Sequence, residues 1–288
     1  MTESYLPQFI IIGAVKAATT WVLEQLQANP AIFMPGPEPH YFSSEFHRGP
    51  DYYTSFFEGK AAPGQMLGEK SADYLAHPLA AERMAKMLPQ VRLAAQLRNP
   101  VERAYSDYKM LYRRGTIKGQ PEDYLLSLDN PQPRFLLDGL YADHLSRWFE
   151  HFPQDRFNIF LFEDVRARPR EVVEQLTLHI GATPFYDEVT ARRRANDSSE
   201  HFLPLPVRTA LAPLKKSVAP LRGTKWFEGV RSLMTKQIDY PPLSADVSAR
   251  LRDFYAKDVE RLGQMIGRDL SHWVTEKKPV MVESVGAA

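Results

Sequence analysis

The stretch from Phe9 to Gln27, FIIIGAVKAATTWVLEQLQ, constrains the fold more than any other part of the chain. Its first four residues are continuously apolar and aromatic or β-branched, which is typical of a strand buried on both faces. Gly13 ends this run, and Thr19 and Thr20 stand where a mainly apolar helix begins. A strand, a tight loop and a helix in this order indicate an α/β protein.

The loop between that strand and that helix is suited to hold an anion. Lys16 lies in it, and the backbone N–H groups at a helix N-terminus point toward a ligand. A Walker A loop requires G-x-x-x-x-G-K-[ST], whereas here Lys16 precedes the two threonines and no second glycine is present. The pattern predicts phosphate binding but fits a kinase or NTPase poorly.

Strands and helices alternate along the rest of the chain, which favours a parallel sheet. We predict further strands at 66–70, 91–97 and 157–162, and helices at 78–88, 138–152, 169–180 and 251–267. A chain of 288 residues with 44% hydrophobic residues is large enough for one sizeable core. We therefore assign residues 1–275 to a single three-layer domain, with a central, mainly parallel sheet flanked by helices, and 276–288 to a polar C-terminal tail.

Composition excludes several classes of protein. The chain has no cysteine, so disulfides, thiolate zinc sites and cysteine nucleophiles are excluded. Its eight histidines show no metal-ligand spacing, and its net charge of +1 gives no overall attraction to nucleic acid. The longest apolar run, Phe9 to Val15, is far shorter than the roughly 20 residues that cross a bilayer. We expect a cytoplasmic protein without a transmembrane segment.

A second strand–helix junction, at 98–100, resembles the first in character. Asn99 and Pro100 suit the N-cap and first turn of a helix, and Arg98 stands at the carboxyl end of the preceding strand. Ligands bind outside the carboxyl ends of parallel strands, so Arg98 and Lys16 would project toward one site. Arg98 can hold a phosphate through its planar fork, and Ser106, two turns into the helix, can reach the same phosphate.

A proline-rich loop at 35–42, PGPEPHYF, offers a candidate general base. Its three prolines exclude a regular helix and hold Glu38 and His40 on a stiff segment beside aromatic residues. A carboxylate in such surroundings can have a raised pKa and accept a proton from a substrate. Glu69 and Lys70 end the next predicted strand, and because they point to opposite faces only one need face the site.

These motifs resemble those of sulfotransferases that use 3′-phosphoadenosine 5′-phosphosulfate (PAPS). VKAATTWVLEQL is similar to the family's 5′-phosphosulfate loop, usually K-x-G-T-T before an apolar helix, and LRNPVERAYSDY resembles its 3′-phosphate motif. EPHYF at 38–42 and GEKSADYL at 68–75 resemble segments of the heparan sulfate and related carbohydrate sulfotransferases. The similarity extends over nearly the whole chain and implies a P-loop-like fold.

The resemblance implies a role for each motif. Lys16 would contact the transferred sulfonate, and Arg98 and Ser106 would bind the 3′-phosphate. A loop at 192–198 that includes Arg194 would close over the nucleotide. Backbone N–H groups and hydroxyls of the first loop would hold the 5′-phosphate: Ala17, Ala18, Thr19 and Thr20.

The resemblance also implies the catalytic groups. Glu38 would be the general base that takes the proton from the acceptor hydroxyl, and Lys70 would neutralise charge near the sulfonate. His40 is the alternative base, because cytosolic small-molecule sulfotransferases use a histidine. The family's usual glycine before Thr-Thr is Ala18 here.

The sequence thus predicts an enzyme that moves the sulfonate of PAPS to a hydroxyl, or an amine, of a small-molecule or carbohydrate acceptor by in-line displacement. The product nucleotide would be 3′-phosphoadenosine 5′-phosphate (PAP), and no metal is required when lysines supply the positive charge. Two alternatives stay open: a nucleotide kinase or other phosphotransferase, and a non-catalytic nucleotide-binding module. The acceptor and the oligomeric state are not specified by any motif.

Overall fold

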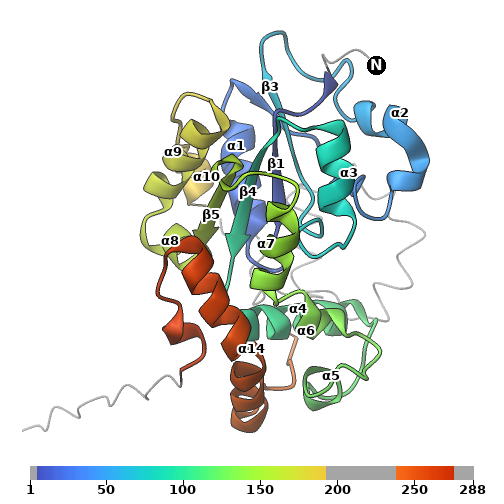
Figure 1. Cartoon of the computed structure of the whole chain (residues 1–288), viewed down its shortest axis with the longest axis vertical. Helices are drawn as coiled ribbons and strands as arrows, with labels where there is room; N and C mark the ends of the chain where they lie inside the picture. Colours follow the sequence, from blue (N-terminus) through green and yellow to red (C-terminus); the bar gives the residue numbers. More distant parts are fainter. Residues whose placement is uncertain (1–4, 193–237, 276–288) are drawn as a thin grey trace, which may run out of the picture.

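The computed structural model describes residues 5–192 and 238–275 of the chain. Within these residues, five strands form one sheet in the order β2-β3-β1-β4-β5, and every neighbouring pair is parallel (Figure 1). The strands are β1 (Phe9–Gly13), β2 (Ile32–Phe33), β3 (Met66–Lys70), β4 (Arg92–Leu97) and β5 (Phe157–Leu161). The predicted α/β class with a central parallel sheet is confirmed.

Helices pack on both faces of the sheet (Figure 1). The α-helices of the described residues are α1 (Thr19–Ala28), α2 (Gly49–Thr54), α3 (Ala80–Met87), α4 (Pro100–Arg114), α5 (Glu122–Leu125), α6 (Arg134–Leu137), α7 (Tyr141–Phe149), α8 (Phe162–Ala167), α9 (Pro169–Ile180), α10 (Glu188–Ala191) and α14 (Ala245–Ile266). Short 3₁₀ helices are η2 (Phe46–Arg48), η3 (Gln154–Arg156) and η5 (Ser271–Trp273).

The central strand β1 explains the three layers. Its side chains alternate between two apolar cores: Phe9 and Ile11 join the core under α1 and α9, whereas Ile10 and Ile12 join the larger core under α3, α4, α7 and α14. All five residues of β1 are buried. A strand covered on both faces must be apolar on both, which is why its sequence is a continuous apolar run.

The starts of α4 and α1 differ in a way that matters for ligand binding. The side chain of Asn99 accepts hydrogen bonds from two first-turn N–H groups of α4, at 2.9 and 3.4 Å, and Pro100 occupies the first turn, as predicted. In α1 the N-cap residue is Ala18, which makes no side-chain hydrogen bond to the first turn. The N–H of Trp21 bonds to the carbonyl of Ala18 at 3.2 Å, but no side chain caps the N–H groups of Thr19 and Thr20, which can therefore bind another acceptor.

Several predicted bounds were wrong, for local reasons. The last helix begins at Ala245 rather than 251, because Ser244 caps it through the N–H of Val247 at 3.3 Å. The helix predicted at 138–152 is the shorter α7, which starts after Gly139, a residue pressed against the ring of Tyr255. Strand β2, with two residues, and helix α8, with six, are too short to show a sequence period.

Two predictions cannot be followed further in space. The predicted tail at 276–288 lies outside the described residues, and so does the part of the predicted closing loop that contains Arg194. Among the described helices, none combines the length and apolar character needed to span a membrane.

Candidate active site

The loop between β1 and α1 has the backbone shape of an anion site. Lys16 and Ala18 both have φ of 67°, in the left-handed region, with Ala17 between them. The N–H of Ala17 bonds to the carbonyl of Ala14 at 3.2 Å, which closes a tight turn before α1. Left-handed residues in such a loop turn successive N–H groups toward one concave side, a geometry typical of phosphate sites. Thr19 is buried and Thr20 half-buried at the start of α1.

Lys16 is a basic residue in a partly desolvated position. Its Nζ lies 3.8 Å from the sulfur of Met110 in α4. Burial lowers the pKa of Lys16 to about 8; Asp107 opposes this shift, and the neighbouring charges of Arg113, Arg114 and Arg98 add to it. A bound anion would favour the charged ammonium.

Arg98 joins the second junction to the first. Its Nη1 donates to the backbone carbonyl of Lys16 at 3.4 Å, and its Nη2 forms an ion pair with Glu102 at 3.1 Å. The guanidinium carbon also lies 4.8 Å from the ring centroid of Phe162 at the start of α8. The structure thus brings together the two predicted phosphate-binding junctions.

A cavity of about 390 Å³ opens beside Arg98, between α4, the start of α14 and η5. Its lining includes Arg98, Lys109 and Arg252 together with Tyr105. Burial, helped by the charge of Arg98, lowers the pKa of Lys109. Ser106 is half-buried on α4, does not line this cavity, and makes no hydrogen bond to Arg98 within the described residues. The role of Ser106 stays a prediction.

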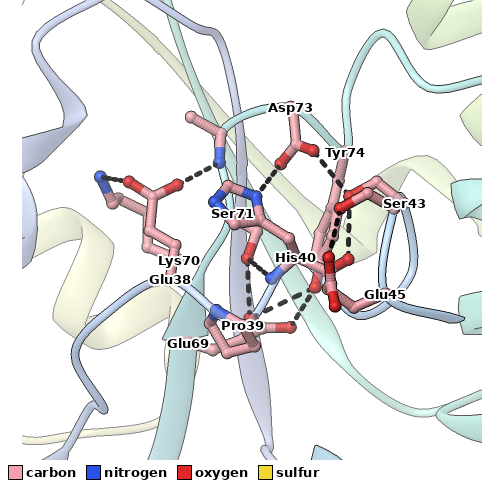
Figure 2. Close-up of polar contacts among 12 residues, drawn as sticks. Glu38, Pro39, His40, Ser43, Glu45, Glu69, Lys70, Ser71, Asp73 and Tyr74 are labelled. Atoms are coloured by element: carbon pink, nitrogen blue, oxygen red, sulfur yellow. Dashed lines mark hydrogen bonds and ion pairs between the residues drawn. The ribbon is translucent and has the colours of Figure 1, made fainter. Parts of the chain in front are cut away.

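The predicted base is held at the carboxyl end of β3. Figure 2 shows the carboxylate of Glu38 between two donors: the Nζ of Lys70 lies 2.7 Å from Oε1, and the backbone N–H of Ala72 donates to Oε2 at 3.1 Å. The side chain of Lys70 is 4% exposed and that of Glu38 30% exposed. Both oxygens of Glu38 are therefore oriented, while part of the group still meets solvent. Of the pair that ends β3, Lys70 is the residue that meets the predicted base.

His40 has a different set of partners from Glu38. Its Nδ1 lies 2.8 Å from Oδ1 of Asp73, and this hydrogen bond raises the pKa of His40 (Figure 2). The other oxygen of Asp73 accepts from the hydroxyl of Ser43 at 2.6 Å. Glu38 is thus held by Lys70 and Ala72, whereas His40, two residues later, is held by Asp73.

Comparison with known proteins identifies the family. The model of the sulfotransferase domain matches residues 6–199. The chain belongs to the sulfotransferase family. The prediction of a sulfotransferase from its motifs is therefore confirmed at the level of the family.

Several sulfotransferases that are similar to this chain are named for the modification of heparan sulfate. One is the bifunctional heparan sulfate N-deacetylase/N-sulfotransferase 2 of Bos taurus, 26% identical over 302 residues, which cover 94% of this chain and 31% of the relative. Another is the heparan sulfate glucosamine 3-O-sulfotransferase 3B1 of Mus musculus, 29% identical over 273 residues, 92% of this chain and 64% of the relative. The chain spans about a third of the length of the bifunctional relatives.

A solved sulfotransferase from Alicyclobacillus acidocaldarius supports the fold assignment. It superimposes with a TM-score of 0.70 and 23% identity, and the match covers 94% of this chain and 99% of that one. The predicted P-loop-like three-layer fold is confirmed by this likeness together with the parallel sheet.

The family motifs include partners that sequence reasoning missed. Asp73 lies inside GEKSADYL, and Glu102 inside LRNPVERAYSDY, yet neither was predicted to contact a site residue. A carboxylate in a loop or in a first helical turn usually serves the backbone or solvent. Only the fold shows that these two pair with His40 and Arg98.

One cluster in this sulfotransferase has donor atoms of the kind that bind metals. Glu38, His40 and Asp73 bring potential ligand atoms within 4.8 Å of one another. The ammonium of Lys70 already lies 2.7 Å from Glu38, and His40 and Asp73 bond to each other. A divalent ion would have to displace these contacts, so the donor set fits an ion-pair network better than a metal centre.

Proposed function

We propose that this chain transfers the sulfonate of PAPS to a hydroxyl or amine of a small-molecule or carbohydrate acceptor. The observation that carries the proposal is the 3.4 Å contact between Arg98 and the carbonyl of Lys16. It joins two strand–helix junctions, each with a basic side chain. A nucleotide with phosphates at both its 3′ and 5′ positions needs two such anion sites side by side, and ATP does not. Family membership supports the same reaction.

The 5′ side of the nucleotide would lie on the loop before α1. Its uncapped first-turn N–H groups, with the residues Ala17 to Thr20, would hold the 5′-phosphate. Lys16 would neutralise charge on the sulfonate and on the oxygen that bridges sulfur to phosphorus. That oxygen gains negative charge as the sulfur–oxygen bond breaks, so the same ammonium would favour departure of PAP.

The 3′ side would be held by Arg98 and Ser106. The guanidinium of Arg98 forms an ion pair with Glu102 at 3.1 Å. A phosphate dianion is a stronger acceptor than one carboxylate, and it would accept from Arg98 in a bidentate way.

Glu38 would take the proton of the acceptor while the acceptor oxygen or nitrogen bonds to sulfur. The donors Lys70 and Ala72 fix its carboxylate, so its free lone pairs have a defined direction. Lys70 would also lie near the equatorial sulfonate oxygens. His40 is the alternative base, and its contact with Asp73 would orient its ring and stabilise its protonated form.

The first test separates the two candidate bases. Glu38→Gln should lower turnover of PAPS by at least about a hundredfold while leaving the affinity for PAP unchanged, because the base contacts the acceptor. Turnover is measured as PAP released with an acceptor panel that contains a glucosamine oligosaccharide and para-nitrophenol. Glu58→Gln, on an exposed glutamate, is the matched control. Normal turnover by Glu38→Gln together with loss in His40→Ala would reassign the base.

The second test addresses the donor nucleotide. Arg98→Ala should weaken PAP binding by about 2 kcal/mol, or about thirtyfold, because a charge-assisted contact is lost. Calorimetry with PAP and with ATP measures this, and Arg250→Ala, on the exposed face of α14, serves as control. Tight ATP binding without any response to PAP would favour the kinase alternative. Tight PAP binding without turnover of any acceptor would favour a non-catalytic module.

A further inference from the structure

Glu69 is a buried carboxyl group directly beneath the proposed active site. It precedes Lys70 on β3, is fully buried, and accepts hydrogen bonds from three hydroxyls. The Tyr53 hydroxyl lies 2.7 Å away, and those of Tyr74 and Ser71 each lie 3.1 Å away. Three donors surrounding one carboxyl group favour its ionised form, although burial opposes the charge.

One of these donors connects Glu69 to the loop that carries the proposed base. The hydroxyl of Ser71 donates to Glu69 and accepts from the backbone N–H of His40 at 3.0 Å (Figure 2). A hydroxyl has a single proton, so donating it to Glu69 directs the lone pairs of Ser71 toward His40. His40 has φ of 51°, a left-handed conformation that is uncommon for a residue with a side chain.

We propose that Glu69 is a positioning residue for sulfonate transfer: its carboxylate orients Ser71, which fixes the backbone of His40 and so the loop that presents Glu38. This inference rests on the proposed function. Within the described residues, Glu69 makes no hydrogen bond or ion pair to the nucleotide loop or to Glu38, and it would act only through Ser71 and the loop backbone.

The surroundings of Glu69 make this control dependent on pH. Burial raises the pKa of Glu69 to about 7, against the hydrogen bonds from Tyr53, Ser71 and Tyr74, which lower it. The charge of Asp73 also raises the pKa of Glu69, and the charge of Glu69 in turn helps to raise the pKa of His40. A protonated Glu69 can no longer accept from all three hydroxyls, so the hold on the loop weakens as pH falls through about 7.

The central experiment compares the wild-type enzyme with Glu69→Gln, which keeps the shape but cannot ionise. We expect kcat at pH 8 to fall at least about tenfold with little change in the PAPS KM, because a small displacement of a catalytic group is costly. In the wild type, kcat should fall as pH drops through about 7 because Glu69 becomes protonated; this acidic limb of the pH profile should be absent in Glu69→Gln. PAP release with the acceptor panel above gives kcat, and PAP affinity and the Tm report folding.

Tyr53→Phe distinguishes Glu69 from His40 as the group that titrates. It removes a hydroxyl that lowers the pKa of Glu69, so the acidic limb should move up by about one pH unit. In the described part of the chain, the Tyr53 hydroxyl donates to Glu69 and makes no hydrogen bond to His40. A limb that stays in place or moves down shows that Glu69 is not the titrating group and overturns the pH part of the proposal. Tyr124→Phe, remote on α5, should leave the profile unchanged.

A second measurement tests the hydrogen bond between Ser71 and His40 directly and needs no nucleotide. Hydrogen–deuterium exchange at the His40 amide should quicken at least about tenfold in Ser71→Ala and in Glu69→Gln, because the hydroxyl that holds this N–H is lost or reoriented. Ser71→Thr, which keeps a hydroxyl, should restore protection and kcat. Unchanged exchange and unchanged kcat in Ser71→Ala would overturn the proposal. A wild-type chain that never releases PAP would instead overturn the proposed function.

Discussion

Ala18 occupies the N-cap position of α1 with a left-handed backbone, φ 67° and ψ 29°, at the position where the resembling loops have glycine. An L-residue in this region is strained by close contact between its Cβ and the backbone, which costs about 1–2 kcal/mol. Ala18 thus adopts a backbone conformation that glycine would adopt without this strain.

Ala18→Gly should accordingly be neutral or stabilising. The relief of strain exceeds the entropy that glycine adds to the unfolded chain, and we expect a gain of up to about 1 kcal/mol in the free energy of unfolding. Ala85→Gly, inside the regular helix α3, is the matched control and should lose about 1 kcal/mol. Urea denaturation of both variants measures the difference. Equal losses at the two positions would contradict a strained Ala18.

In strand β3, three consecutive residues have different surroundings. Gly68 pairs with Phe9 in β1, and a Cβ added at Gly68 would come within 2.1 Å of the Phe9 ring. The next two residues point to opposite faces: Glu69 into the buried hydroxyl cluster and Lys70 to Glu38. Gly68 and Lys70 therefore share one face of the strand, toward Phe9 and Glu38, and Glu69 lies on the other face.

Gly68→Ala should be strongly destabilising. The Phe9 ring is fully buried and has to shift to admit the methyl group, so we expect a loss of about 3 kcal/mol. Phe9→Leu, made together with Gly68→Ala, should recover part of this loss because the smaller side chain vacates the contact. A double-mutant cycle from urea denaturation measures the coupling. Additive losses would show that the ring does not limit this position.

At the scale of the whole molecule, the site collects groups from distant parts of the chain. Lys16 contacts Met110 of α4, and its pKa is affected by the charges of Arg98, which follows β4, and of Arg113 and Arg114 at the end of α4. Burial, together with these three positive charges, lowers the pKa of Lys16 to about 8. The free protein is therefore partly deprotonated at Lys16 in mildly alkaline solution, although a free lysine would not be.

Binding of PAP near pH 8 should take up a proton. Without a bound anion, the amine of Lys16 is about half protonated at this pH. A bound phosphate raises the pKa of Lys16 back toward the usual value, so uptake of about half a proton is expected. Affinity should fall as pH rises above 8. Calorimetry in buffers of different ionisation enthalpy measures the uptake, which Lys16→Met should abolish and Lys118→Met, on an exposed lysine, should not. Absence of uptake by the wild type would place Lys16 away from the anion.

The sequence by itself predicted the alternation of the longer strands and helices, the parallel sheet, the tight basic loop before α1 and the Asn99–Pro100 start of α4. Apolar period, capping and turn chemistry act within a few residues, so the local sequence records them. Only the tertiary structure decided which side chains meet. Arg98 reaches the carbonyl of Lys16 from 82 residues away, and His40 reaches Asp73 from 33. Such pairings depend on strand order and on the direction of each strand end, which a single sequence does not encode locally.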